Sequence, residues 1–259
     1  MAKTATTPET GLNTPQAAGL STQAAMPDWM KSQAANLGNE NVSNEDLVIP
    51  RLAIIQSQSP ELDADDPKYI EGAKQGQMFN TLTRALYDAI YLVDCFFRKE
   101  YAVFVKRTEG GGFRGSFPTE KEAVQYVAGS EDAQKLEVTE TAIHFCLAVN
   151  PDTGSVLGEV AVPMTSTKLK VSRNWNSMIR MRGGDRFAGI WKMVTKKEKN
   201  DKGSFFNYNV SPGPWVSEAI YEAAKATYES IQSGMKDIDR TDSDSTTVTV
   251  EPPSAEERF

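Results

Sequence analysis

The chain has 259 residues, a length that corresponds to one or two domains. It carries 28 Lys and Arg against 35 Asp and Glu, so its formal net charge is −7. Taken whole, this charge argues against a nucleic-acid-binding protein, but the acidic residues are concentrated at the two ends. Residues 1–46 hold 2 basic and 5 acidic side chains and residues 237–259 hold 2 and 7, which leaves the segment between them at +1.

Composition also excludes several classes of protein. No run of 18 or more apolar residues is present to span a bilayer, and the first residues lack the basic-then-apolar pattern of a secretion signal. We therefore expect a cytoplasmic protein that does not bind membranes. Cys95, Cys146 and the one histidine, His144, are too few to build a structural zinc site, which needs about four ligands. No cofactor is predicted.

The distribution of apolar residues predicts one folded domain between two flexible ends. Residues 1–46 are rich in Ala, Thr, Gln, Asn and Pro and cannot bury enough surface to offset the entropy of ordering, so we interpret them as a flexible arm. Core density begins at Leu47 and continues to about Ile231. We assign residues 47–236 to a single β-rich domain and residues 237–259 to a disordered acidic tail.

Alternation of apolar and polar residues predicts that most of this domain consists of strands in hairpins. Residues 141–149 and 156–162 alternate and flank the turn sequence Asn-Pro-Asp-Thr-Gly, which predicts a hairpin. A second hairpin is expected from residues 187–195 and 204–210, around a turn rich in Lys, Asn, Asp and Gly. Two more strands are expected on either side of a polar Arg-Lys-Glu sequence, at residues 90–93 and 101–105.

Capping and stop signals predict three helices. Thr119 with Glu122 forms a capping box for the first, which ends at Gly129. Ser166 is expected to cap the second, which runs to Arg182. The third spans about residues 216–233, with its apolar residues at helical spacing: Ile220, Ala224, Thr227 and Ile231. Many strands with few helices favour a mainly β or α+β fold, an OB-like barrel or small antiparallel β-barrel decorated by about three helices.

Motifs for catalysis are weak or incomplete. Gly110-x-Gly112-x-x-Gly115 has the form of a dinucleotide fingerprint, but three residues separate its last glycine from the next helix, so a glycine turn explains it better. His144 alternates with Ala142 and Cys146 along an apolar strand, which favours a hydrogen-bonded core histidine over a general base. No nucleophile is indicated with its base, and we interpret the protein as a binding protein rather than an enzyme.

The most distinctive segment is basic. Residues 165–202 carry 11 basic and 3 acidic side chains, a local net charge of +8. On a helix that turns about 100° per residue, Lys170, Arg173 and Arg180 share one side. The hairpin that follows interleaves aromatic rings with lysines, which is typical of surfaces that bind a single nucleic-acid strand: cations neutralise phosphates, and rings stack on unpaired bases. The alternative is that about half of these rings are core and the lysines keep a hairpin tip soluble.

We therefore predict a groove formed by the basic helix and the hairpin, with Trp191 and either Phe205 or the pair Phe206 and Tyr208 as stacking rings. Strand alternation places Phe205 on the opposite face from Phe206 and Tyr208, so one of these faces should be buried. The predicted nucleic-acid-binding residues are Lys168, Lys170, Arg173, Arg180, Arg182, Arg186, Trp191, Lys192, Lys196, Lys197, Lys199, Lys202, Phe205, Phe206 and Tyr208.

The C-terminal tail is acidic, rich in Ser, Thr and Pro, and ends in Glu-Glu-Arg-Phe. It resembles the C-termini of bacterial and bacteriophage single-stranded DNA-binding proteins, in which an OB-type barrel holds the strand and the tail recruits replication and repair partners. The resemblance implies that Phe259 docks partners, with Glu251, Glu256 and Glu257 supplying charge. Arg258 interrupts the acidic run and departs from the family pattern.

Blocks of the core also resemble a tailed-phage protein family of this layout, which is associated with single-strand binding. The resemblance covers about residues 47–235 and the terminus. The blocks are Ile49-Pro-Arg-Leu, Gly76-x-x-Phe-Asn80, Phe97-Arg-Lys-Glu-Tyr101, Lys168-Leu-Lys-Val-Ser-Arg-Asn-Trp175 and Lys202-Gly-Ser-Phe-Phe-Asn-Tyr208.

The sequence as a whole predicts a phage-encoded, sequence-tolerant single-stranded DNA-binding protein. It is expected to protect the strand during replication, recombination or repair in the host cytoplasm and to recruit partner proteins through its tail. Two alternatives stay open: an accessory protein that binds mainly protein partners, and a metal-dependent nuclease, whose carboxylates need no cysteine or histidine. The sequence also leaves a homo-oligomer open.

Overall fold

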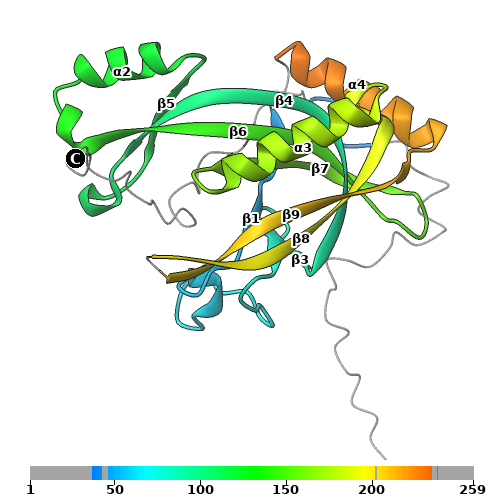
Figure 1. The fold of residues 1–259 in the computed structure, drawn as a ribbon, viewed down its shortest axis with the longest axis horizontal. Helices are drawn as coiled ribbons and strands as arrows, with labels where there is room; N and C mark the ends of the chain where they lie inside the picture. The colour runs from blue at the N-terminus through cyan, green and yellow to red at the C-terminus, as the bar shows by residue number, and fades with distance from the viewer. Residues whose placement is uncertain (1–36, 43–45, 202, 235–237, 239–259) are drawn as a thin grey trace, which may run out of the picture. The chain divides into compact units, whose positions relative to one another are not determined.

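The computed structural model describes residues 37–42, 46–201, 203–234 and 238 (Figure 1). These residues belong to one of the two units into which the chain divides, Asn36–Phe259. Most of the predicted arm and nearly all of the predicted tail lie outside the described residues. The described part contains two antiparallel sheets and three α-helices, which confirms the mainly β, α+β class.

The larger sheet has six strands in the order β7-β6-β4-β8-β9, with β5 paired to β4 off this path. Both predicted hairpins are present, as β6–β7 and β8–β9. Within the described residues the sheet stays open, because its outer strands β7 and β9 do not pair with each other. The strands are β4 (Ala89–Val105), β5 (Phe113–Phe117), β6 (Leu136–Val149), β7 (Val156–Thr165), β8 (Gly189–Asn200) and β9 (Gly203–Trp215).

Strand β4 runs without a break through Arg98, Lys99 and Glu100, so the predicted separation into two strands was wrong. Each of these polar residues lies opposite a residue of β6, and Lys99 also forms a 2.7 Å ion pair with Glu140 on that strand. In its pairing with β6, the register of β4 shifts between Asp94 and Phe96, where β4 bulges. Pairing with a long neighbouring strand therefore overrides the local polarity of the sequence.

A second sheet of three short strands bridges the opening between the outer strands. Arg51, next to β1, forms a bridge with Ala161 of β7. On the other side, the Gln56 amide both donates to the carbonyl oxygen of Phe206 and accepts from its N–H, at 2.9 Å each. The residues on either side of β1 thus contact β7 and β9, respectively, without a continuous ladder. The strands are β1 (Leu52–Ile54), β2 (Met78–Asn80) and β3 (Leu86–Tyr87).

The three helices begin and end close to the predicted positions. They are α2 (Glu120–Ala128), α3 (Lys168–Arg182) and α4 (Glu218–Gln232). The Thr119 hydroxyl accepts from the Glu122 N–H at 3.3 Å, as the capping box predicts. Ser166 does not cap α3, because it adopts a left-handed φ of 52° and Thr167 takes the position next to the helix. Gly183, with φ of 78°, follows α3 as its predicted stop.

Two helices cover opposite faces of the larger sheet, with α3 crossing one face in Figure 1 and α4 on the other. Trp175 of α3 is fully buried in a cluster with Trp191 of β8, whereas Ala224 of α4 packs with Leu147 of β6. The four predicted core positions of α4 are all buried. Helix α2 lies with β5 at the distal end of β4 and β6.

Gly76 tests the contact between the small sheet and the hairpin. It has φ of +86°, and a Cβ added there would lie 2.6 Å from the Phe206 ring. We expect Gly76→Ala to lower the free energy of unfolding by about 2–5 kcal/mol, because left-handed strain adds to overpacking. Gly72→Ala is the matched control, since φ is +77° but nothing lies within 4 Å; it should cost only about 1–2 kcal/mol. Equal losses in urea unfolding would contradict the Phe206 contact.

Candidate nucleic-acid interface

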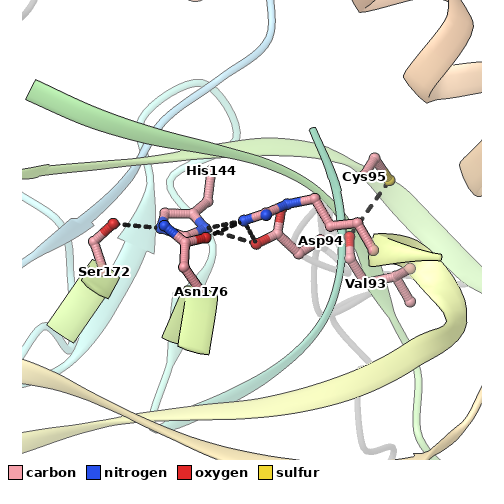
Figure 2. A network of polar contacts seen from close by, with 7 residues as sticks. Val93, Asp94, Cys95, His144, Ser172 and Asn176 are labelled. Carbon is pink, nitrogen blue, oxygen red and sulfur yellow. Dashed lines mark hydrogen bonds and ion pairs between the residues drawn. The ribbon is translucent and has the colours of Figure 1, made fainter. Parts of the chain in front are cut away.

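A buried polar network joins α3 to the centre of the larger sheet (Figure 2). His144 of β6 lies between Asp94 of β4 and Ser172 of α3: Nδ1 is 2.6 Å from Asp94 Oδ2, and Nε2 is 2.8 Å from Ser172 Oγ. Arg186 donates its Nε and Nη2 to the two Asp94 carboxylate oxygens at 2.9 and 2.8 Å. Its Nη2 also donates to Asn176 Oδ1 of α3 at 2.6 Å.

The order Asp94, His144, Ser172 is that of a hydrolase triad, in which a carboxylate orients the histidine that activates the serine. Two features oppose a catalytic role in this structure. Ser172 is 1% exposed, so a substrate has no access to its hydroxyl, and Trp175 is stacked on the His144 ring with a centroid distance of 4.3 Å. The contacts confirm the prediction that His144 is a hydrogen-bonded core residue.

The centre of this network is the ion pair between Asp94 and Arg186, to which α3 is joined by hydrogen bonds of Ser172 and Asn176. Burial by itself would raise the pKa of Asp94, but His144 and Arg186 beside it hold that pKa below its usual range. Asp94 is therefore an ionised carboxylate in the core, and Arg186 supplies the compensating charge. Removing one member of such a pair leaves the other charge buried without compensation, which is strongly destabilising.

The solvent-facing side of the β8–β9 hairpin carries a different set of residues. We use the term hairpin face for Tyr91, Lys192, Lys196, Phe205 and Asn209, which lie on the side of the sheet opposite α3. Lys192, Lys196 and Asn209 are exposed, while the rings of Tyr91 and Phe205 are half-buried. Lys192 is the cross-strand partner of Tyr91, and its Nζ lies 5.9 Å from the ring centroid. Tyr91 also packs partly against the cluster beneath α4, so this side of the sheet presents exposed lysines beside two half-buried rings.

The pleat of β8 and β9 decides which predicted rings are accessible. Trp191 is 1% exposed and Tyr208 3% exposed, because both point into the cluster beneath α3. Phe206 points the same way and contacts Gly76. This corrects the prediction that Trp191 or Tyr208 offers a stacking surface, while the half-buried Phe206 has part of its ring against Gly76. Phe205, on the other face, keeps that role as a prediction.

The predicted cations are divided between the two sides of the sheet. Lys170, Arg173 and Arg180 lie exposed on the outer side of α3, as predicted. Lys197 and Lys199 are exposed on the hairpin but alternate with the residues of the hairpin face, so they point to the α3 side. The one continuous groove expected from the sequence is therefore replaced by two basic surfaces.

Three other predicted cations are engaged in internal contacts. Arg186 belongs to the buried network, and Arg182 donates to the Gly213 carbonyl oxygen at 2.9 Å. Lys168 is half-buried with its Nζ 5.4 Å from the centroid of the Tyr208 ring, and burial lowers its pKa to about 8. Lys202 and the predicted partner-binding residues Glu251, Glu256, Glu257 and Phe259 lie outside the described residues.

Two aromatic residues with solvent-accessible rings, Tyr91 and Trp215, were not predicted from the sequence. Tyr91 sits in an apolar run that predicts only a buried strand, and its pairing with Lys192 requires the register of β4 on β8. Trp215 is 57% exposed at the end of β9. In the sequence, Trp215 follows Pro-Gly-Pro and comes just before the last helix, a position that could have indicated an exposed residue at the end of an element.

Residues 20–237 match the model of a family described as Pam3 phage gp34-like protein. The chain belongs to this family. The matched residues include all the strands and helices described above. The match supports the association with a bacteriophage that the sequence predicted. Searches of curated proteins and of solved structures gave no match.

Membrane spans and metal-binding clusters are both absent from the described part of the chain. None of its helices combines the length and apolar composition needed to cross a bilayer. Among the same residues, no three His, Cys, Asp or Glu side chains come together as a set that could hold a metal ion.

The network predicts a specific dependence of stability on pH. Because the pKa of folded Asp94 is depressed, its stabilisation is present above the ordinary value of about 3.9 and is lost as the pH falls through the folded value. We expect Asp94→Asn to lower the free energy of unfolding by about 3–5 kcal/mol at pH 7. The difference from wild type should shrink below about pH 4, as measured by urea unfolding.

Asp152→Asn, in the exposed β6–β7 turn, is the matched control and should leave the profile unchanged. Ser172→Ala removes only the last hydrogen bond of the network and should cost about 1–3 kcal/mol, so it tests the network if the Asp94 variant does not fold. A constant difference between Asp94→Asn and wild type down to about pH 2.5 would contradict the ionised buried carboxylate.

Proposed function

We propose that the protein is a sequence-tolerant single-stranded DNA-binding protein of a phage and that its hairpin face binds the strand. The observation that carries this proposal is the interleaving of the exposed Lys192 and Lys196 with the half-buried rings of Tyr91 and Phe205 on one side of the sheet. A single strand requires both components, since its phosphates need cations and its unpaired bases need flat apolar surfaces. A duplex, whose bases are stacked on each other, has no use for the rings.

The geometry of a strand supports this match. Residues two apart along β8 share a face and are about 6.7 Å apart, so Lys192 and Lys196 are spaced by about 13 Å along the hairpin. The acidic residue on this side of β8, Glu198, accepts a hydrogen bond from the neutral Asn207 amide at 3.0 Å and keeps its negative charge. The two exposed lysines outnumber it, so this side of the hairpin is positively charged on balance.

The uneven charge of the chain reconciles this role with a net charge of −7. The basic segment contributes +8 locally, while both ends are acidic. We propose that the strand is protected during phage replication or recombination and that the C-terminal tail recruits the proteins that act on it. The nuclease and accessory-protein alternatives predict other results in the same binding assay, namely cleavage of the DNA in the presence of a divalent metal or no binding at all.

Removing the two lysines of the hairpin face should weaken binding in a salt-dependent way. Each neutralised phosphate contributes about 0.7 to the log–log salt slope of single-strand binding, so Lys192→Gln/Lys196→Gln should reduce the slope by about 1.4. The measurement is fluorescence anisotropy of a labelled oligothymidylate at several salt concentrations. Lys121→Gln/Lys135→Gln, two exposed lysines near α2, is the matched control. The same slope change in both double variants would reject the hairpin face as the site.

The C-terminal tail is expected to compete with DNA for the basic surfaces, which gives a separate prediction. Residues 237–259 hold 7 acidic and 2 basic side chains, so they are attracted to the same basic surfaces as DNA. Deleting them should tighten oligonucleotide binding at low salt, and the difference should vanish at high salt because exposed charges are screened. Titration of the full chain and the deletion variant in parallel provides the measurement. An affinity that does not change on deletion would contradict the competition.

A further inference from the structure

Trp215 differs from the other tryptophans of the described residues. Its exposed fraction is 57%, whereas Trp175 and Trp191 are almost completely buried. The Arg182 guanidinium carbon lies 4.0 Å from the centroid of the Trp215 ring, which is the distance of direct stacking on one ring face. Because the residue is nevertheless more than half exposed, its other ring face is open to solvent.

Three contacts fix the position of the Arg182 guanidinium on which the Trp215 ring is stacked. Its Nη1 donates to the carbonyl oxygen of Gly213 at 2.9 Å, and its guanidinium carbon also lies 5.6 Å from the ring centroid of Trp191. The guanidinium passes so close to Gly189 that a Cβ at that position would lie 3.0–3.2 Å from it. The guanidinium is therefore held between the β8 backbone and the indole, and the indole has a defined position before any ligand arrives.

We infer that Trp215, supported by Arg182, is a base-stacking platform for an unpaired nucleobase, at the opposite end of the hairpin from Phe205. This inference rests on the proposed function and extends its site. Single-strand binding uses aromatic rings, on which bases stack, and positive charges, which attract phosphates. Trp215 and Arg182 supply one of each at the same place.

Along the hairpin, the two lysines lie between Phe205 and Trp215, although Trp215 is on the opposite side of the sheet. Lys196 lies opposite Asn207 and Lys192 opposite Ser211, both between Phe205 and Trp215 on β9. The two rings are about ten residues apart along the chain, which corresponds to about 33 Å of strand. Trp215 lies on the α3 side, and β9 is an outer strand of the larger sheet, so a DNA strand leaving the hairpin face reaches it by passing the edge of β9.

The main alternative is a protein partner that binds an apolar patch. Met181, at 80% exposure, is the other large apolar side chain exposed near the end of α3. The guanidinium stacked behind the indole favours a nucleobase, which carries a neighbouring phosphate, over an aliphatic side chain. A protein partner is therefore the contrary outcome of the test.

The test compares Trp215→Ala, Trp215→Phe and Met181→Ala with the wild-type chain in the oligothymidylate titration. Loss of one stacked base should raise the Kd of Trp215→Ala by roughly 5- to 150-fold, and Trp215→Phe should retain most of the affinity because it keeps a ring. Met181→Ala should bind like wild type. Saturating oligonucleotide should quench wild-type tryptophan emission more than that of Trp215→Phe, which provides a second readout if Trp215→Ala is destabilised.

The outcomes separate this inference from the proposed function. If the wild-type chain does not bind the oligonucleotide, the proposed function fails. If it binds through Lys192 and Lys196 while Trp215→Ala has unchanged affinity and Trp215→Phe shows equal quenching, only the stacking platform is overturned. An equal loss of affinity in Trp215→Ala and Met181→Ala would also overturn it, since that pattern is typical of a general apolar contact.

Discussion

Successive side chains of a β-strand point to opposite faces, and this constraint determines what the basic hairpin can offer to a ligand. Helix α3 covers one face of β8 and β9, so Trp191 and Tyr208 are committed to the core. The alternate residues Lys192, Lys196 and Phe205 are thereby directed away from the helix. Helix α3 covers one side of β8 and β9, whereas α4 covers the other side of the sheet around Leu147 and Ile190. The candidate site lies beyond α4 on that second side, where Lys192 and Lys196 are exposed.

The position of α3 depends in turn on the buried charges below it. Asp94 and His144 come from two neighbouring strands, Ser172 and Asn176 from the helix, and Arg186 from the segment between α3 and β8. Buried ion pairs contribute little net stability compared with apolar packing, but they tolerate few alternative arrangements, because any misplaced charge stays uncompensated. We interpret the network as a device that fixes the register of α3 on the sheet and with it the direction of the hairpin side chains.

The same hairpin contains aromatic residues with different roles. Trp191 stabilises the core, Phe206 contacts the small sheet at Gly76, and Trp215 is held at the surface by Arg182. Family membership places the chain among Pam3 phage gp34-like proteins. The charge of the basic segment is what supports the polyanionic ligand that we propose. Arg182 illustrates how a residue of a basic segment can act through an aromatic neighbour rather than through exposed charge.

The sequence by itself determined the elements whose signals are local: the hairpins, the capped helix after Thr119, the buried stripe of α4 and the hydrogen-bonded core role of His144. It also located the basic segment and the alternation that separates Phe205 from Phe206 and Tyr208. Only the tertiary structure decided that β4 continues through Arg98 to Glu100 and that Trp191 is buried. It also decided that Tyr91 lies beside Lys192 and that Trp215 is exposed on the α3 side of the sheet. Those features depend on which strand lies beside another and which face a helix covers, and contacts between residues far apart in the chain leave no periodic signal in either segment.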